Sequence, residues 1–200
     1  MKLVTLQAGD TVADTVQTVT PYYARLLKSK GYRGVKRYVE SVQAAELVNC
    51  FNEGLAMGFV TYAKDWNPFN SLSHLHNLGV IPGHHLALDV EGVTLDPQDL
   101  IAKERAWCNT VVAAGVIPER YCGAQQLLTG REMYLMPYRA YWHSCSDVVD
   151  RFGNQAVPDC GYMTIQDKRF NVTLEPGYVV DNNHIVGDFV GRFPIFVEGS

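Results

Sequence analysis

The chain alternates short β-rich segments with helix-like stretches or loops, and this alternation limits the fold more than any other feature of the sequence. About eight segments are predicted as strands by their apolar and β-branched content. In chain order these are Leu3–Gln7, Arg33–Val39, Leu55–Tyr62, His85–Val90, Arg120–Cys122, Ala140–Ser144, Tyr162–Gln166 and Tyr178–Asp181. Strands that alternate with helices are typical of an α/β fold with a parallel sheet.

The length of 200 residues then restricts the architecture. A (β/α)8 TIM-type barrel usually has about 250 residues. We therefore predict one α/β domain over residues 1–200, a compact barrel with some helices shortened or missing. A doubly wound open sheet is the alternative, but no glycine-rich nucleotide-binding motif follows any predicted strand.

The segments between the predicted strands supply the helices. Apolar residues recur at helical spacing in Thr20–Lys30 and Gln43–Asn52. Asp96 followed by Pro97 predicts an N-cap and first turn, for a helix that runs to about Ala114. A short helix is expected over Gly123–Thr129, and a long loop with one helical piece over Lys64–Gly83.

Composition excludes several classes of protein. Hydrophobic residues make up 47% and charged residues 19% of the chain, which is unlike a disordered protein. The net charge of −4 gives no basis for nonspecific nucleic-acid binding. Apolar runs are far shorter than the ~20 residues that a membrane span needs, so we expect no membrane insertion.

The five cysteines, at positions 50, 108, 122, 145 and 160, are odd in number and widely spaced. This pattern favours free thiols, mostly in the core, in a reducing compartment. The first residues turn polar too early for a signal peptide. We therefore expect synthesis in the cytoplasm.

The segment from His85 to Gly92 carries the most chemical information. An apolar strand leads to Asp89 and Glu91, which project to the same side with their Cα atoms about 6.6 Å apart. In a parallel barrel this end of a strand hosts the active site. A protonated carboxyl beside an ionised one suits glycosidic-bond cleavage. A solvated acidic strand end is the alternative explanation.

Further segments resemble a known family. The family has an Asp-x-Glu motif at the end of its fourth strand, which is matched here by Asp89-Val90-Glu91. The family's second strand is similar to the segment Gly31-Tyr32-Arg33-Gly34-Val35-Lys36-Arg37-Tyr38. The remaining matches, in chain order, are Gly9-Asp10, Gly54-Leu55-Ala56-Met57-Gly58-Phe59-Val60, Tyr121-Cys122-Gly123, Tyr141-Trp142, Ile165-Gln166 and Asp181-Asn182-Asn183. Together they resemble the glycoside-hydrolase-like barrel domains known as domain of unknown function 1906. Those domains are related to the family 25 glycoside hydrolases, which are lysozyme-type muramidases.

The resemblance implies roles for particular residues. Glu91 would be the general acid, and Asp89 would orient the reacting N-acetyl group or stabilise the developing cation. Asp10 and Asp181 would complete an acidic cleft. The residues implied to line the sugar site are Tyr62, Tyr121, Trp142, Gln166 and Asn183.

The six histidines suggest a rival site, since His74-Leu75-His76 could contribute two zinc ligands. No third ligand is near in the sequence, so we predict no metal and no cofactor, with polar loop or core histidines as the default. Cys145 near His143 could form a nucleophile pair, but residues two apart rarely meet productively outside a strand.

Three functions remain open at this stage. The first is a glycoside hydrolase that cleaves β-1,4 bonds, with bacterial peptidoglycan or another polysaccharide as partner. The second is a carbohydrate-binding or phage-particle module on the same barrel, with virion or tail components as partners. The third is a metal-dependent hydrolase. Without a signal peptide, a wall-degrading protein would reach the bacterial cell wall after lysis or as part of a virion.

Overall fold

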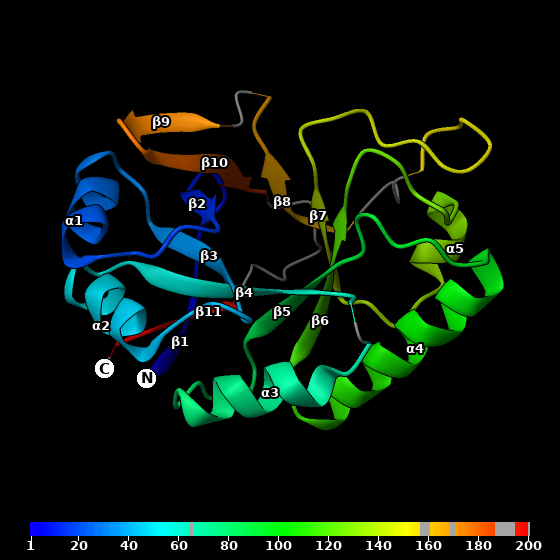
Figure 1. Ribbon diagram of the computed structural model, residues 1–200, viewed down its shortest axis with the longest axis horizontal. Coiled ribbons are helices and arrows are strands. Elements are labelled where there is room, and N and C mark those ends of the chain that lie inside the picture. Colours follow the sequence, from blue (N-terminus) through cyan, green and yellow to red (C-terminus); the bar gives the residue numbers. More distant parts are fainter. Residues whose placement is uncertain (65, 157–160, 169–170, 187–194, 200) are drawn as a thin grey trace.

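The central feature of the fold is a ring of strands that closes on itself (Figure 1). The computed structural model describes residues 1–64, 66–156, 161–168, 171–186 and 195–199. The 8 strands of the barrel are β2 (Thr11–Thr15), β3 (Gly34–Tyr38), β4 (Ala56–Tyr62), β5 (His85–Asp89), β6 (Ile117–Cys122), β7 (Ala140–His143), β8 (Tyr162–Gln166) and β10 (Tyr178–Ile185). The predicted compact TIM-type barrel is confirmed.

In the part of the chain that the structure describes, helices follow the first five strands of the barrel. They are α1 (Pro21–Ser29), α2 (Ala44–Asn52), α3 (Pro68–Asn77), α4 (Pro97–Ala113) and α5 (Gly130–Tyr134). Within the described ranges, no helix follows β7, β8 or β10. Among the described residues, some strands therefore lack a following helix, as the short chain requires.

Three of the helices begin with the same pair of signals, a capping side chain followed by proline. Thr20, Asn67 and Asp96 each accept a hydrogen bond from a backbone N–H of the first turn. Proline at the next position has no N–H to leave unsatisfied and has the helical φ already fixed. The helix predicted from Asp96 is therefore confirmed, and α3 is the helical piece expected within the loop over Lys64–Gly83.

The short helix predicted over Gly123–Thr129 is wrong. The helix α5 begins at Gly130 instead, immediately after the predicted segment. The Thr129 side chain accepts from the backbone N–H of Glu132, and the Glu132 carboxylate accepts from the backbone N–H of Thr129. This reciprocal capping box fixes the start of the helix.

One barrel strand runs against the others, which the expectation of a parallel sheet did not anticipate. β10 pairs antiparallel with both β8 and β2. The cause is local, because β9 (Val172–Glu175) and β10 form a hairpin across Pro176-Gly177. Gly177 has a φ of 86°, which a tight turn needs and other residues resist.

The first barrel strand also differs from the prediction. The segment predicted as strand Leu3–Gln7 forms β1 (Lys2–Thr5), which pairs with β11 (Ile195–Glu198) outside the ring. The ring instead begins with β2. At its amino-terminal end, Phe196 packs with a small set of apolar side chains, Leu6, Val12, Ala56 and Ile185. Glycine is required nearby, since a Cβ at Gly58 would lie 2.5 Å from the Phe196 ring.

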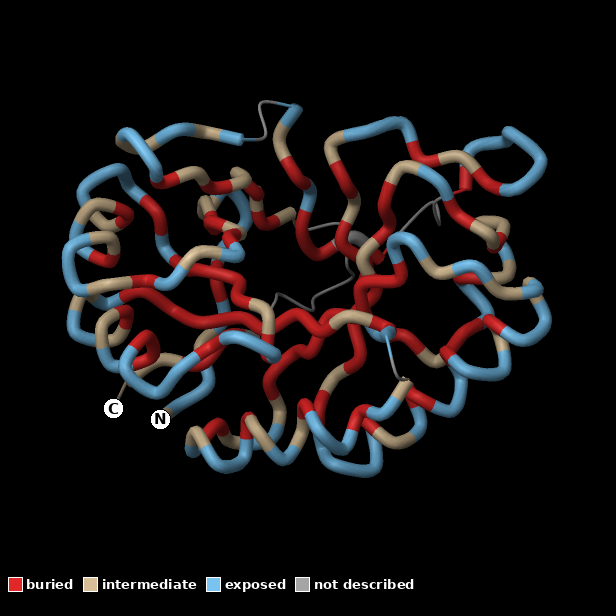
Figure 2. Tube along the Cα trace, viewed as in Figure 1, coloured by how far each residue is buried: buried red, intermediate tan, exposed pale blue. Residues whose placement is uncertain are grey.

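Buried residues follow the strands and the inner faces of the helices, whereas exposed residues lie at the periphery (Figure 2). Cys50, Cys108 and Cys122 are buried free thiols, as predicted, and Cys145 is half-buried. Cys160 lies outside the described residues. No helix in the described part of the chain is long and apolar enough to cross a bilayer.

A buried ion pair joins α4 to β6. Arg120 donates to both carboxylate oxygens of Glu104 at 3.0 and 2.9 Å, and the hydroxyl of Tyr138 donates to the same carboxylate. Neither charged side chain is exposed. Because water reaches neither side chain, each charge is stabilised by the opposite charge of its partner.

We predict that Glu104→Ala lowers the free energy of unfolding by about 3–5 kcal/mol, because it leaves the Arg120 guanidinium buried without a counter-charge. Urea denaturation followed by circular dichroism measures the change. Arg105→Ala, at the neighbouring exposed position of α4, is the matched control and should change stability by less than about 0.5 kcal/mol. Equal effects of the two substitutions would contradict a structural role for the pair.

Candidate active site at the carboxyl end of the barrel

Asp89 and Glu91 lie where the sequence placed them, at the carboxyl end of β5. Asp89 is buried and accepts two hydrogen bonds, from the hydroxyl of Tyr38 at 3.0 Å and from the backbone N–H of Glu91 at 2.9 Å. Burial nevertheless raises the pKa of the Asp89 carboxyl above its ordinary value. Glu91 is exposed at the barrel mouth. Burial of part of its carboxyl and the neighbouring Asp89 charge raise the pKa of Glu91.

A glycine makes room for the Glu91 carboxyl. A Cβ at Gly123, just after β6, would lie 2.8 Å from both Cγ and Cδ of Glu91. The φ angle of Gly123 is not in the left-handed region. A Cβ here would therefore displace the Glu91 side chain, whose carboxyl lies directly against this backbone.

A third carboxyl, Asp14 on β2, was not predicted from the sequence. Its Oδ1 is fully shielded and has no hydrogen-bond partner among the described residues. Burial is the main cause that raises the pKa of Asp14 to about 7; Lys36 opposes it, and the charges of Asp181 and Asp89 add to it. These interactions place Asp14 among the acidic residues of this end of the barrel.

Asp181 completes the acidic group from β10, where it pairs directly with Asp14. Its carboxylate accepts hydrogen bonds from the side-chain amide of Gln166 at 2.9 Å and from the backbone N–H of Asn171 at 2.7 Å. The Gln166 oxygen in turn accepts from the hydroxyl of Tyr121 at 3.2 Å. Three of the predicted residues, Tyr121, Gln166 and Asp181, are thus brought together.

Asp10, the fourth predicted acid, is not brought to this end. It precedes β2, and its carboxylate accepts from the backbone N–H of Gln7 and lies 3.9 Å from Arg33. Because Arg33 precedes β3, this cluster is at the amino-terminal end of the barrel. The position that the resemblance assigns to an aspartate at the end of the first strand is filled here by Asp14. The β-branched residues of Thr11–Thr15 are the sequence signal that indicates a strand ending near Asp14.

Trp142 and Asn183 lie beneath the site rather than along its surface. They are 1% and 0% exposed, and the indole N–H of Trp142 donates to the Asn183 side-chain oxygen at 2.7 Å. The Lys36 ammonium lies 3.9 Å from the centre of the Trp142 ring, and Tyr121 packs against the same indole. Neither predicted sugar-binding side chain therefore has a face open to a ligand.

Lys36 is the charged centre of the barrel interior. It is buried, and its ammonium donates to Glu119 at 3.0 Å and to the hydroxyl of Thr164 at 3.2 Å. It points inward because Lys36 and Tyr38 share one face of β3, whereas Arg37 on the other face pairs with Glu46 of α2. The ammonium thus lies below the acidic group.

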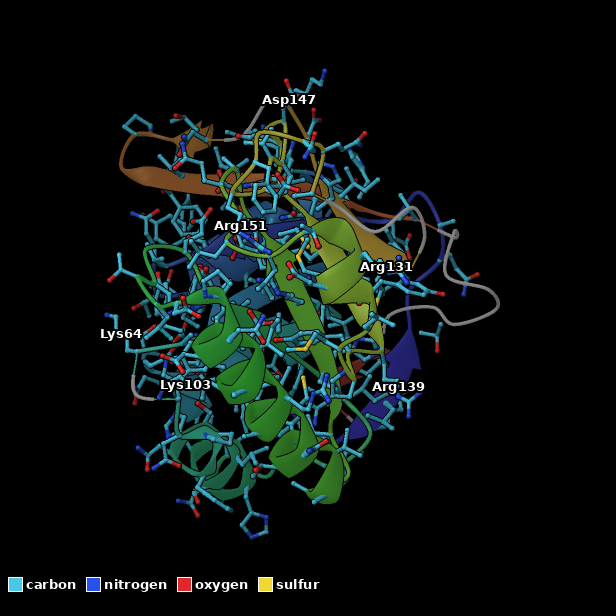
Figure 3. All side chains as sticks on the ribbon, turned by 90° about the vertical axis from the view of Figure 1, so that its right-hand side faces the viewer. Lys64, Lys103, Arg131, Arg139, Asp147 and Arg151 are labelled. Carbon is cyan, nitrogen blue, oxygen red and sulfur yellow. The ribbon has the colours of Figure 1, made fainter. Side chains whose placement is uncertain are left out.

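Two hollows border the acidic residues. Tyr62, Trp66, Glu91 and Leu95 are among the residues around a pocket of about 540 Å³. Tyr62 also stacks on Tyr38, with ring centroids 4.3 Å apart. Lys64, which projects outward in Figure 3, lies over the Tyr62 ring. Trp66 has no predicted role and belongs to the loop before α3.

A second hollow of about 310 Å³ is bordered by Asp14, Tyr38 and Asp181. Burial and the Asp89 charge raise the pKa of Tyr38, which keeps its hydroxyl protonated as a donor to Asp89. Polar and aromatic groups therefore converge around carboxyls, and the pKa values of Asp14, Asp89 and Glu91 are all raised. Such an arrangement can provide an acid and a carboxylate side by side.

The histidines form no metal centre in the described part of the chain, where no three His, Cys, Asp or Glu side chains could hold an ion. His74 and His76 both lie in α3, and the ring of His74 bonds to the carbonyl of Val42 at 2.9 Å. Cys145 contacts the site through its backbone, which donates to Gln166.

Known structures share this barrel. No protein-family model and no curated protein matches the sequence. An uncharacterized protein of B. stearothermophilus aligns with a TM-score of 0.66 at 18% identity, over 91% of this chain and 98% of the other. A family 25 glycosyl hydrolase from Bacillus anthracis aligns with a TM-score of 0.58 at 12% identity, over 90% of each chain. The fold is that of the family 25 glycosyl hydrolases.

A phage protein shows the same likeness over part of its length. The multimodular pneumococcal cell wall endolysin of phage Cp-1 aligns with a TM-score of 0.60 at 12% identity, over 92% of this chain but 56% of the endolysin. This chain thus corresponds to about half of that modular protein.

The raised pKa of Asp14 predicts a pH-dependent stability. The unfolded chain loses this proton near pH 3.8, but the folded chain keeps it to about pH 7, so the charge destabilises the fold increasingly through this window. Asn does not titrate. We therefore expect the melting temperature of Asp14→Asn, relative to the unsubstituted protein, to rise between pH 4 and pH 8.

Thermal denaturation at a series of pH values measures this difference. Asp147→Asn, at an exposed position labelled in Figure 3, is the control and should alter the melting temperature little at any pH. A constant difference between Asp14→Asn and the unsubstituted protein across the series would contradict the prediction.

Proposed function

We propose that this protein is a glycoside hydrolase that cleaves β-1,4 bonds of bacterial peptidoglycan. The observation that carries the proposal is the pair Asp89 and Glu91 at the carboxyl end of β5, with the Glu91 carboxyl seated against Gly123. The family 25 barrel fold supports the same reaction class. An endolysin with this fold has been crystallised with a peptidoglycan analogue.

In the proposed mechanism Glu91 is the general acid. Its raised pKa keeps a fraction of the carboxyl protonated, ready to donate to the glycosidic oxygen as the bond to the leaving sugar breaks. Asp89 is held below by Tyr38 and by the Glu91 backbone. Its carboxylate would orient the sugar's N-acetyl group or stabilise positive charge that develops at the sugar ring.

Asp14 and Asp181 act together on the other side of the mouth. A pKa of about 7 allows Asp14 to exchange a proton near neutrality, and Asp181 is held ready by Gln166 and Asn171. Tyr62 and Trp66 border the same pocket as Glu91. The apolar face of a sugar ring can stack on an aromatic ring, and Trp66 is the candidate here, because Tyr62 already stacks on Tyr38.

The first test is Glu91→Gln. Loss of a general acid costs about 10²–10⁴-fold in rate, so we expect the release of reducing ends from purified cell walls to fall by at least about a hundredfold. The melting temperature should change little, because Glu91 is exposed. Glu53→Gln, at the end of α2 and away from the mouth, is the matched control and should keep full activity.

Two outcomes would overturn the proposal of a metal-independent glycoside hydrolase. If the unsubstituted protein binds walls but releases no reducing ends, the barrel is a carbohydrate-binding or structural module. If a chelator abolishes activity and zinc restores it, the reaction belongs to a metal-dependent hydrolase.

Gly123→Ala tests the seat of the Glu91 carboxyl. The new Cβ would collide with the Glu91 side chain and displace it, so we expect a rate loss of about 10-fold or more from a misplaced acid. Gly92→Ala is the comparison variant, because Gly92 follows Glu91 in the sequence. No atom lies within 4 Å of a Cβ at Gly92, although its φ of 74° adds backbone strain. Activity should fall further in Gly123→Ala than in Gly92→Ala. The reverse order would argue against the positioning of the Glu91 carboxyl by Gly123.

The site of action is part of the proposal. We propose that the protein acts at the bacterial cell wall, after lysis or as a component of a virion. The likeness to a phage endolysin supports this setting. Fractionation of lysed cultures, followed by detection of the protein on cell walls or in particles, distinguishes the two routes.

A further inference from the structure

Among the residues that the structure describes, Tyr38 is the one side chain that donates a hydrogen bond to Asp89. Its hydroxyl lies 3.0 Å from Oδ2, and Oδ1 accepts from the backbone N–H of Glu91 at 2.9 Å. Asp89 is 3% exposed, so water contributes little to the stability of its charge. A buried carboxylate depends on the hydrogen bonds that the protein supplies. One of the two that Asp89 receives therefore comes from Tyr38.

Tyr38 reaches Asp89 from two strands away. β3, β4 and β5 are neighbours in the barrel (Figure 1), and Asp89 pairs directly with Tyr62 of β4. Adjacent strands are about 4.8 Å apart, so the backbones of β3 and β5 are separated by about 10 Å. The Tyr38 and Tyr62 rings are stacked, with centroids 4.3 Å apart and planes inclined by 18°. Tyr62 therefore supports the Tyr38 ring where it crosses β4, and the stack holds the hydroxyl within reach of Asp89.

Other groups act on Asp89 without a side-chain hydrogen bond to it. Burial raises the pKa of Asp89, the Arg120 charge opposes this rise, and the Glu40 charge adds to it. The Arg120 guanidinium is already paired with Glu104. The remaining titratable groups around Asp89 are Asp14, Tyr62, Glu91 and Tyr121. None of these four is a cation, so the ionised carboxyl depends on its hydrogen bonds.

We propose that Tyr38 is a positioning residue that keeps Asp89 in its ionised form, with Tyr62 as the support of the Tyr38 ring. This role rests on the proposed function, in which Asp89 acts as a carboxylate beside the acid Glu91. A donated hydrogen bond stabilises a charged carboxylate more than a neutral carboxylic acid. Tyr38 can donate it at neutral pH, because burial and the Asp89 charge raise the pKa of Tyr38 and keep its hydroxyl protonated.

The first test is Tyr38→Phe, which removes the donor and keeps the ring on Tyr62. The Asp89 carboxyl is followed by ¹³C spectra of protein with labelled aspartate, and its resonance is assigned with Asp89→Asn. We expect Asp89 to titrate at higher pH in Tyr38→Phe, because loss of the donor favours the protonated acid. Tyr62→Leu removes the support but keeps the donor, and should move the titration in the same direction by less. Tyr121→Phe, which removes a hydroxyl bonded to Gln166 instead, is the matched control and should leave the titration unchanged.

The pH profile of reducing-end release from cell walls tests the consequence for the reaction. Molecules with a protonated Asp89 would be inactive, so the acidic limb of the profile should move to higher pH in Tyr38→Phe. At a pH on that limb we expect a rate about tenfold below that of the unsubstituted protein, and the difference should shrink as the pH rises. Tyr134→Phe, at an exposed position of α5, is the control and should keep the profile. Melting temperatures check that each variant is folded.

The two experiments separate this role of Tyr38 from the proposed function. If Asp89 titrates at the same pH with and without the Tyr38 hydroxyl, the proposed role is overturned, whether or not walls are cleaved. If Tyr38→Phe lowers the rate by the same factor at every pH, Tyr38 acts on the structure alone and the role is again overturned. If the unsubstituted protein releases no reducing ends, the proposed function fails, and the titration by itself decides whether Tyr38 keeps Asp89 ionised.

Discussion

The barrel interior depends on the interactions of the buried Lys36 ammonium group. A buried charge of this kind is costly unless it is both paired and hydrogen-bonded. Here Glu119 supplies the counter-charge, Thr164 accepts a hydrogen bond, and the face of Trp142 covers the ammonium. These partners come from β6, β8 and β7, so one side chain of β3 ties together strands on different sides of the ring.

The acidic mouth takes its properties from that centre. Lys36 limits how far burial raises the pKa of Asp14, which pairs across β2 and β3 with the lysine itself. Further along the rim, burial raises the pKa of both Asp89 and Glu91, and the charge of Asp89 adds to the rise at Glu91. The surroundings therefore favour the protonated form of Asp14, Asp89 and Glu91, and a protonated carboxyl is what acid catalysis needs.

The sequence predicted the parts of the site that depend on local pattern. Asp89 and Glu91 follow an apolar strand at a spacing of two, and any strand places such residues on one side. The prediction of Asp10 is wrong because the segment predicted as the first strand, Leu3–Gln7, pairs instead with β11, and the barrel begins with β2, which carries Asp14. That pairing joins the two ends of the chain, and no local pattern reports it.

The sequence by itself determined seven of the eight barrel strands, the helix starts marked by a capping residue and proline, and the acidic end of β5. Each follows from preferences within a few residues. Only the tertiary structure decided which aspartates meet, that β10 runs against its neighbours, and that Trp142 lies under Lys36 rather than at the surface. The physical reason is that closing the ring brings residues from strands far apart in the chain into one buried volume, where their charges and shapes must fit together.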